Sequence, residues 1–470
     1  MTTTTKQELL RKLPSVSALL DTEAAAEWLA EHPRPLVTEC IRDAVEDVRR
    51  QILADTSGRC APVHAGEEYL LDLARQGLLE RTRPHIRAAI NATGIILHTA
   101  LGRAVWPECV VDSMVEGLKG YVTLATDRKT GKRSERHVRV EYILKELTGA
   151  EAATVVNNNA GATLIVLAAL AAGREVVVSR GQLIEIGGAF RLPDVMAQSG
   201  VRMVEVGTTN RTHLRDYERA ITDQTAAIFR AHPSNYRILG FTKQPELAEL
   251  VELAHARGLV LIDDLGAGAL VGLERFGLPH EPTIQESIAA GADAVISSAD
   301  KLIGASQGGV IVGGLEPVER IRTHPLARAL RVDKTCLMAL ERTLHLFRDP
   351  DRLVRDHPTY RMLAAPLEAL RQRAEALAEA VAAAAPQAEA NVAEGVGFLG
   401  SGSLPMEELP TVLVTVTVPG MTAQELAERL RMDEACVFSR IENDQVVLDV
   451  RTMTDAQVPL VAAAVGRATT

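Results

Sequence analysis

The chain has 470 residues, of which 47% are hydrophobic and 24% are charged, and its mean hydropathy is +0.05. A chain of this length predicts two or three domains, and the apolar content excludes an intrinsically disordered protein. The formal net charge of −10 and the aromatic content of 3% do not favour a dedicated nucleic-acid binder, although a local basic face can coexist with an acidic total.

The start of the chain, MTTTTKQELLRKLPSV, is polar and lacks the apolar segment of a signal peptide. The longest apolar stretch, around residues 162–172, is too short to span a bilayer. The five cysteines form no C-x-x-C pair and have no metal-ligand spacing, which predicts reduced thiols and no metal site. These features predict a soluble, cytoplasmic protein without a membrane partner.

Residues 1–88 are predicted to form a helical domain. The segments KQELLRKL, AAAEWLAEH and LVTECIRDAVEDVRRQILAD repeat apolar residues at helical spacing, and prolines and a glycine interrupt them. No clear strand is present in this part of the sequence.

Residues 89–334 are predicted to form a larger α/β domain. From Ile90 onward, short β-branched runs alternate with helical segments, and the candidate strands are AATVV, EVVVS, RMVEV, AAIFRAH, LVLIDD and AVISS. Near-continuous apolar strands separated by helices indicate a mostly parallel sheet covered on both faces. Binding sites of such sheets lie at the carboxyl ends of the strands.

Residues 335–470 are predicted to form a small C-terminal α+β domain. A long alanine-rich helical stretch is expected over residues 361–385, closed by Pro386. Beyond it, TVLVTVTV alternates as a strand, TAQELAERLRM has helical spacing, and DQVVLDVRTM reads as another strand.

Three groups of polar residues follow predicted strands. LVLIDD ends in Asp263 and Asp264, AVISSADK ends in Asp300 and Lys301, and residues 157–159, all asparagine, open a helix whose N-terminus can hold a phosphate. Each group also has a plainer interpretation. Asp264 can cap the following turn, the asparagines can be a helix N-cap, and Lys301 can be a solvated loop lysine.

A phosphate cradle, an acid and a lysine in this chain order are what pyridoxal 5′-phosphate (PLP) requires. The lysine must be held in apolar surroundings so that it is partly neutral and can bond to the cofactor's aldehyde. The acid must face the pyridine nitrogen and keep it protonated, because only the protonated ring is a strong electron sink. The asparagine turn matches neither G-x-G-x-x-G nor Walker A, so PLP is favoured over dinucleotides and nucleoside triphosphates.

Longer motifs identify a family. INATGIILHTALGRA, VNNNAGATL, EIGGAFRLPDVM, VEVGTTNRTHLRDY, HPSNYRILGFT, SADKLIGASQGG and HPLARALRVDK closely resemble segments of bacterial selenocysteine synthases, the L-seryl-tRNA(Sec) selenium transferases. The resemblance covers essentially the whole chain. It implies a fold-type I PLP-dependent transferase of the aspartate-aminotransferase fold, in which the N-terminal helical domain binds tRNA.

The resemblance also implies the reaction and the partners. L-seryl-tRNA(Sec) is converted to L-selenocysteinyl-tRNA(Sec) by selenophosphate, through a PLP-bound aminoacrylyl-tRNA intermediate. The family assembles as a homodecamer, a pentamer of dimers with active sites between subunits. Nothing in the composition or the spacing of the residues bears on this assembly.

Residue roles follow from the matched motifs. Lys301 matches the PLP-binding lysine, Asp264 the residue at the pyridine nitrogen, and Asp300 a residue implicated in catalysis, here the candidate proton donor to the leaving hydroxyl. His232 is expected at the cofactor, although His98 and His232 could each also be a structural histidine. The remaining matches are Asn157, Asn158, Asn159, Ala160 and Gly161 for the cofactor phosphate, and Arg103, Arg328 and Arg331 for selenophosphate.

Some positions depart from the family pattern. Ala299 stands where glycine is usual before Asp-Lys, Ala305 and Ser306 replace Gly-Pro in GGPQ, Ala100 replaces asparagine, and Gln182 replaces glutamate. Arg180 and Gln182 follow a strand and could line the cofactor ring. The main alternative function is a PLP-dependent lyase or transferase of the same fold acting on a small amino acid or amino-sugar acid. A non-enzymatic RNA-binding protein is a second alternative, against which Lys301 and Asp264 argue.

Overall fold

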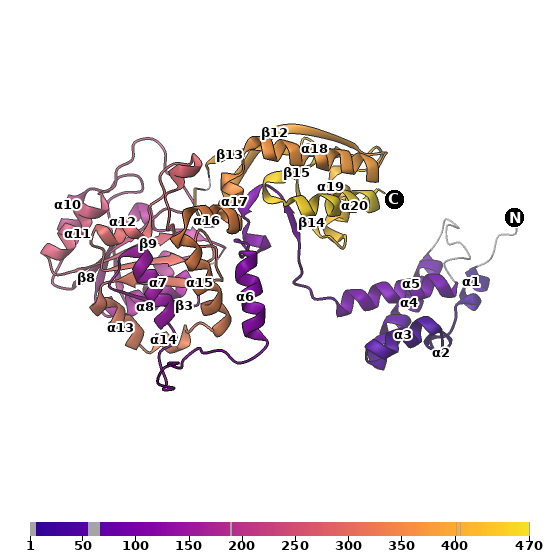
Figure 1. Ribbon diagram of the computed structural model, residues 1–470, viewed down its shortest axis with the longest axis horizontal. Helices are drawn as coiled ribbons and strands as arrows, with labels where there is room; N and C mark the ends of the chain where they lie inside the picture. Colours follow the sequence, from indigo (N-terminus) through magenta and orange to yellow (C-terminus); the bar gives the residue numbers. More distant parts are fainter. Residues whose placement is uncertain (1–5, 55–65, 189, 401, 405, 470) are drawn as a thin grey trace. The chain divides into compact units, whose positions relative to one another are not determined.

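The computed structural model describes all residues except 1–5, 55–65, 189, 401, 405 and 470. The chain divides into two units, residues 1–88 and residues 89–470 (Figure 1). Each unit has its own hydrophobic core.

The described part of the N-terminal unit is helical, as predicted. Its core forms where α4 presents Val37, Ile41 and Val48 at helical spacing toward Leu70 and Leu78 of α5. The helices are α1 (Lys6–Lys12), α2 (Val16–Leu20), α3 (Glu23–Glu31), α4 (Arg34–Ala54) and α5 (Glu67–Thr82).

A seven-stranded sheet organises the larger part of the second unit, in the order β3-β11-β10-β9-β8-β4-β7. All neighbouring strands are parallel except β11, which runs antiparallel to both β3 and β10. The mostly parallel sheet was predicted, whereas β11 was not among the candidate strands. The strands are β3 (Ala152–Val156), β4 (Glu175–Ser179), β7 (Arg202–Val206), β8 (Thr225–Ala231), β9 (Val260–Gly266), β10 (Ala294–Ser298) and β11 (Gly309–Gly313).

Helices cover both faces of this sheet because alternate strand residues point to opposite sides. Val155 and Val295 face one core, whereas Val156 and Ile296 face the other. The first face packs against α7 (Val138–Thr148), α11 (Leu247–Ala256) and α12 (Ile284–Ala289), and the second against α8 (Asn159–Ala171), α9 (Leu192–Gln198) and α13 (Leu315–Thr323). The other helices of this part are α6 (Glu108–Leu118), α10 (Leu214–Ala220), α14 (Leu326–Ala329), α15 (Lys334–Leu344) and α16 (Pro350–Asp356), and a short hairpin joins β5 (Glu185–Ile186) to β6 (Phe190–Arg191).

A six-stranded sheet, in the order β1-β14-β15-β13-β12-β2, forms the smaller part of the unit. Its strands β1 and β2 come from residues 90–97, directly after the N-terminal unit, and pair in parallel with β14 and β12. The sheet thus combines chain segments from both sides of the predicted boundary at residue 334. The strands are β1 (Ile90–Ala92), β2 (Ile95–Leu97), β12 (Glu389–Gly400), β13 (Glu408–Thr417), β14 (Val437–Glu442) and β15 (Gln445–Asp449); α18 (Leu367–Ala384), α19 (Ala423–Met432) and α20 (Val458–Ala468) pack against them.

The alanine-rich stretch differs from its prediction. The single helical stretch expected over residues 361–385 is broken, because α17 (Pro358–Ala364) ends before Ala365 and Pro366, and α18 starts at Leu367. Proline has no backbone N–H to donate and disfavours helical geometry at the residue before it. Within the described residues, no helix is long and apolar enough to cross a membrane.

Candidate active site

Lys301 lies in a buried loop just after β10, at the carboxyl end of the strand. The residue is 6% exposed. Burial lowers the pKa of its amine below the usual range, and the negative charge of Asp300 opposes that shift. Lys301 lines a pocket of about 330 Å³, together with Asp264, Asp300 and His232. A buried amine of this kind is available as a nucleophile and a base.

The loop that carries Lys301 is fixed by α17. The Tyr360 hydroxyl donates a hydrogen bond to the Leu302 carbonyl (2.8 Å), and Nε2 of His357 bonds to the Ile303 carbonyl (3.0 Å). Both side chains are fully buried. Helix α17 therefore positions the backbone directly after the lysine.

Asp264, at the end of β9, faces the same pocket. Its Oδ1 accepts hydrogen bonds from Asn159 Nδ2 (2.9 Å) and the Gly266 N–H (3.0 Å), and its Oδ2 accepts one from Thr163 (3.2 Å). Burial raises the pKa of this carboxyl group, and these hydrogen bonds oppose the rise. The hydrogen bond from Gly266 shows that Asp264 also caps the turn that follows β9, as its plainer interpretation predicted. Asp264 lines the Lys301 pocket at the same time.

The asparagine turn joins β3 to α8. Asn158 is the N-cap of α8 and accepts a hydrogen bond from the Gly161 N–H (2.8 Å). Asn158, Asn159 and Ala160 line the Lys301 pocket, whereas Asn157 and Gly161 support the turn behind it. The positive end of α8 is thus directed at the pocket, as an anion site requires.

Arg103 pairs with Asp300, since its Nη1 lies 2.5 Å from Asp300 Oδ2. Arg103 has a φ of +63°, in the left-handed region. A side pocket of about 370 Å³ shares Arg103, Asp300 and Gln307 with the Lys301 pocket. Of the three predicted anion-binding arginines, Arg103 is the one that this chain brings to its own lysine.

Arg328 and Arg331 line a different pocket, of about 560 Å³, together with Arg133. Their i, i+3 spacing predicted that the two arginines share one helix face. This prediction was wrong, because α14 ends at Ala329 and Arg331 lies beyond it. Arg331 instead forms an isolated bridge with Val156. Burial and the neighbouring charges of Arg136, Arg328 and Arg133 lower the pKa of Arg331. Such a cluster of like charges is suited to binding an anion.

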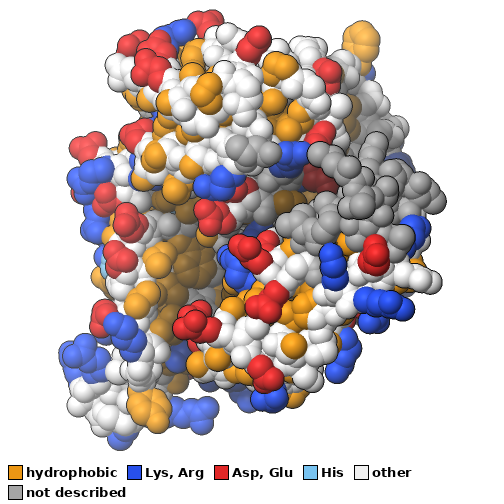
Figure 2. Space-filling model, turned by 90° about the vertical axis from the view of Figure 1, so that its right-hand side faces the viewer, with side chains coloured by type: hydrophobic (Ala, Val, Ile, Leu, Met, Phe, Trp, Pro, Cys, Tyr) orange, Lys and Arg blue, Asp and Glu red, His pale blue; other side chains and the backbone are white. Residues whose placement is uncertain are grey.

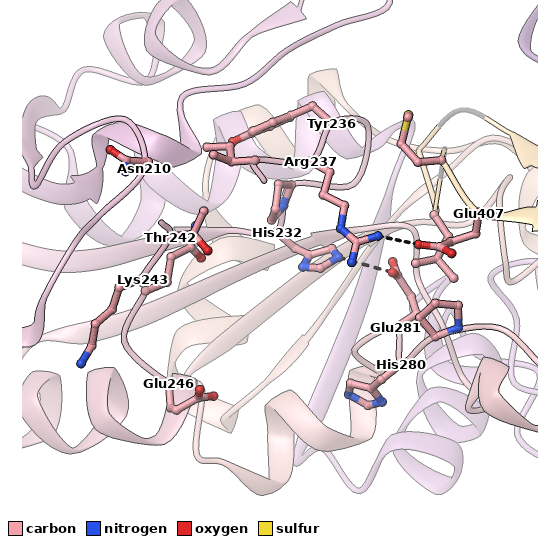
Figure 3. Close-up of a pocket in the computed structure, with 16 residues that line it drawn as sticks. Asn210, His232, Tyr236, Arg237, Thr242, Lys243, Glu246, His280, Glu281 and Glu407 are labelled. Atoms are coloured by element: carbon pink, nitrogen blue, oxygen red, sulfur yellow. Dashed lines mark hydrogen bonds and ion pairs between the residues drawn. The ribbon is translucent and has the colours of Figure 1, made fainter. Parts of the chain in front are cut away.

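His232 lies between two pockets. Its backbone N–H donates to the Asp264 carbonyl (2.8 Å), and its Nε2 lies 3.4 Å from Oε2 of Glu281, which is 2% exposed. His232 lines the Lys301 pocket and also a neighbouring pocket of about 450 Å³ (Figure 3). Sequence reasoning missed Glu281, which follows no predicted strand.

Gly402 was also missed. It lies between β12 and β13 with a φ of +89°, and a side chain there would collide with Nζ of Lys301. The lysine loop of the large sheet and this segment of the small sheet therefore meet at the amine. Only the folded chain shows this contact, because no motif surrounds Gly402.

Several weaker predictions receive definite places. His98 lines an apolar pocket with Ala100, away from the Lys301 pocket, and burial lowers its pKa. Gln182 is buried and accepts a hydrogen bond from the Ala231 N–H (3.2 Å). Arg180 pairs with Glu205 (3.0 Å). Two residues at departures from the family pattern, Ala305 and Ser306, line the side pocket beside Arg103; Ala299 is fully buried.

Comparison with known sequences identifies close relatives along the whole chain. The family described as L-seryl-tRNA selenium transferase matches residues 89–454, and the one described as selenocysteine synthase N terminal matches residues 10–49. The L-seryl-tRNA(Sec) selenium transferase of Nitratidesulfovibrio vulgaris is 44% identical over 98% of this chain and 99% of its own length. That of Alkaliphilus metalliredigens is 42% identical over 96% of both chains.

Solved structures support the fold. D-Glucosaminate-6-phosphate ammonia-lyase superposes with a TM-score of 0.58 at 21% identity, covering 83% of this chain and 98% of its own. A likeness at this identity bears on the fold alone. Together with the family match, it confirms the predicted α/β architecture of fold type I, with a mostly parallel large sheet, a smaller C-terminal α+β part and a helical N-terminus.

Proposed function

Because the chain belongs to the L-seryl-tRNA selenium transferase family, we propose that the pocket around Lys301 is its active site. The enzyme converts L-seryl-tRNA(Sec) to L-selenocysteinyl-tRNA(Sec). We assign its cofactor, its selenium donor and the role of each residue from the side chains that line the pocket. With an aminoacyl-tRNA as substrate, its place of action is the cytoplasm.

The residues of the pocket fit PLP. A buried amine with a lowered pKa faces a buried carboxyl group, and the N-terminus of α8 lies beside both. Asn159 Oδ1 is buried and has no hydrogen-bond partner among the described residues, so the turn retains an acceptor for a ligand. Lys301 would carry the cofactor, Asp264 would hold the proton of the pyridine nitrogen, and Asn158 to Ala160 would bind the phosphate. When bound, PLP stabilises negative charge at the seryl α-carbon.

Two side chains then move protons. Lys301 Nζ removes the α-proton of the seryl group, for which its lowered pKa suits it. Asp300, once it is protonated and released from its ion pair with Arg103, gives a proton to the departing β-hydroxyl, which leaves as water. The adjacent positions of Asp300 and Lys301 bring both groups to one substrate.

Selenophosphate is the proposed selenium donor. Its selenium forms a bond to the β-carbon while Lys301 Nζ returns the proton to the α-carbon. Water then cleaves the Se–P bond and releases phosphate, so that the water lost from serine is regained. Arg103 lies at the lysine and can exchange Asp300 for this anion. Arg328 and Arg331 line a separate pocket of the same chain. We therefore assign them to the anion site of a neighbouring copy, within a ring of dimers that builds a homodecamer.

The N-terminal unit is the proposed tRNA-binding domain, in keeping with its family match over residues 10–49. On the face drawn in Figure 2, acidic and basic side chains are interspersed and no single-sign field dominates. Binding of RNA by a chain of net charge −10 must then depend on local basic surfaces repeated over several copies.

The burial of Lys301 opposite Asp264 carries this proposal. Its test is conversion of radiolabelled seryl-tRNA(Sec) by wild type and by Lys301→Ala, with and without selenophosphate. Selenocysteinyl-tRNA should form only with the wild-type enzyme and only when selenophosphate is present. Lys301→Ala should lose the visible absorption of bound cofactor. Replacement of the exposed Lys119 by alanine is the control and should change neither property. A wild type that binds PLP but converts no seryl-tRNA would overturn the proposal and favour a lyase of small amino acids.

A further inference from the structure

The pocket on the far side of His232 is not used by the chemistry above. It has a volume of about 450 Å³ and lies between the loops that follow β8 and β9 and the segment that precedes β13 (Figure 3). His232 lines both this pocket and the Lys301 pocket. A molecule bound here would therefore lie next to the Lys301 pocket, with His232 between the two.

The charges of the pocket do not favour a free anion as its ligand. It is lined by two basic side chains, two histidines and three carboxylates: Arg237, Lys243, His232, His280, Glu246, Glu281 and Glu407. Arg237 is already engaged, since its Nη1 lies 2.7 Å from Glu407 Oε1. Because Glu407 already neutralises Arg237, that arginine is not free to bind an anion, and the carboxylates of the pocket favour a ligand that donates hydrogen bonds.

Glu281 is the most deeply placed of these carboxylates. It is 2% exposed, and its Oε2 lies 3.4 Å from Nε2 of His232. Figure 3 shows Glu281 and His232 pointing toward each other within this pocket. Buried carboxylates in nucleotide sites accept hydrogen bonds from ribose hydroxyls. Glu281 can do so beside His232, which also lines the Lys301 pocket.

The rest of the lining suits a flat, mostly neutral group. The Tyr236 hydroxyl is bonded to the Gly181 carbonyl, which fixes the ring at the pocket wall. Ile238, Pro279 and Met406 add apolar surface, and Asn210 and Gln244 add amide groups. Aromatic rings and amides are the side chains with which proteins bind unpaired bases.

We propose that this pocket holds the terminal ribonucleoside of the acyl-RNA substrate. The base lies along Tyr236, and Glu281 accepts a hydrogen bond from the ribose hydroxyl next to the ester. The ester then extends past His232 toward Lys301. This assignment rests on the proposed function, because an amino acid esterified to a terminal ribose is what requires a nucleoside site beside the lysine.

The test measures binding of 3′-(L-serylamino)-3′-deoxyadenosine, which has an amide in place of the ester, to the holoenzyme by calorimetry. L-Serinamide, which lacks the nucleoside, and the 2′,3′-dideoxy form of the probe serve as comparisons. Wild type should bind the probe about tenfold or more tightly than L-serinamide, as expected of one stacked base. Loss of the 2′-hydroxyl should weaken binding about tenfold, as expected of a hydrogen bond to a charged group.

Two variants locate the effect. Glu281→Gln replaces the charged acceptor by a neutral one and should reduce the effect of the 2′-hydroxyl on binding. Tyr236→Leu should weaken the probe about tenfold while leaving L-serinamide unchanged. Tyr142→Leu, at an exposed tyrosine of α7, is the matched control. If Glu281→Gln fails to fold, the proposal is still tested by Tyr236→Leu and by the binding of the three compounds to wild type.

The outcomes separate the two proposals. A wild type that converts seryl-tRNA(Sec) but binds the probe no better than L-serinamide would overturn the nucleoside site and leave the function intact. Binding that responds equally to Tyr236→Leu and Tyr142→Leu would also overturn it. A wild type that binds the probe as expected but converts no seryl-tRNA(Sec) would retain the nucleoside site and remove the proposed function.

Discussion

Gly402 and Lys301 share a boundary that leaves no room for a side chain on the glycine. Any Cβ at position 402 would overlap the lysine amine, and the φ of +89° already favours glycine. Gly402 belongs to the segment between β12 and β13, whereas Lys301 follows β10 of the other sheet. The amine is thus enclosed by two sheets that meet there.

Substitution of Gly402 tests this enclosure. Gly402→Ala should displace the Lys301 amine and reduce the rate of selenocysteinyl-tRNA formation by about tenfold or more, the effect expected of a small displacement of a reacting group. Gly420→Ala is the matched control, since Gly420 also has a positive φ (+83°) but has no atom within 4 Å of its Cβ position. It should lower the melting temperature slightly and leave the rate unchanged. Equal rates for both variants would show that the contact with Lys301 is unimportant.

Asp264→Asn should inactivate the enzyme and yet stabilise the cofactor-free protein. Burial raises the pKa of this carboxyl group, so ionising Asp264 costs more in the folded than in the unfolded chain. That penalty appears as the pH rises through the unfolded and then the folded pKa, and it is fully present above both. Removing the charge should therefore raise the melting temperature of the apo protein at neutral pH. A lower melting temperature would contradict this account.

The neighbouring Asp263→Asn should behave in the opposite way. Asp263 is fully buried, and it accepts hydrogen bonds from Arg230 (2.7 Å) and Ser287 (2.7 Å). Its replacement leaves the Arg230 charge uncompensated, with an expected loss of about 1–3 kcal/mol in the free energy of unfolding. Denaturant titration of the two variants, side by side, checks the pair of expectations.

Arg103→Met should shift the pH dependence of cofactor attachment. Burial is the main cause of the lowered pKa of Lys301, and the positive charge of Arg103 lowers it further. Without Arg103, the pKa of Lys301 should rise, and the rate at which PLP attaches to the apo protein should reach half its maximum at a higher pH. The KM for selenophosphate should rise as well. Arg352→Met, at an exposed arginine paired with Asp356, should alter neither.

Mixing two inactive variants tests the assignment of Arg331 to a neighbouring copy. Lys301→Ala and Arg331→Ala should each be nearly inactive. Reassembled together at equal amounts, half of the dimers are mixed and each has one intact site, so activity should return to about a quarter of wild type. If the mixture stays inactive although mixed dimers form, Arg331 acts within its own chain or elsewhere.

Much of the large sheet could be predicted because its strands are buried on both faces. AATVV and AVISS are continuous apolar runs that end in polar residues, and they form β3 and β10. GVIVG was overlooked as β11 because glycines bound it. Tertiary packing explains why residue 309 is a glycine. A Cβ on Gly309 would collide with the carbonyl of Asn158, so the strand approaches the asparagine turn as closely as glycine allows.

The candidate site divides along the same line. Lys301 and Asp264 were found because strand ends are marked in the sequence, and the structure places both in one pocket. Glu281 and Gly402 reach the site only through tertiary packing, and neither has a local signal. The pairing of Arg103 with Asp300 joins residues that are far apart in the chain, and single-sequence reasoning has no access to such pairs.

The position of β1 constrains the order of folding. Ile90 pairs with Val437, and Ile95 pairs with Phe398, so two edge strands made early in synthesis find partners made near its end. A nascent chain must hold these apolar strands unpaired while the large sheet forms, which slows folding and exposes them to association with other chains. Chains that terminate before residue 437 would lack the partner of β1 altogether. Quality control of such fragments would therefore act on exposed strands near residue 90, close to the N-terminal unit.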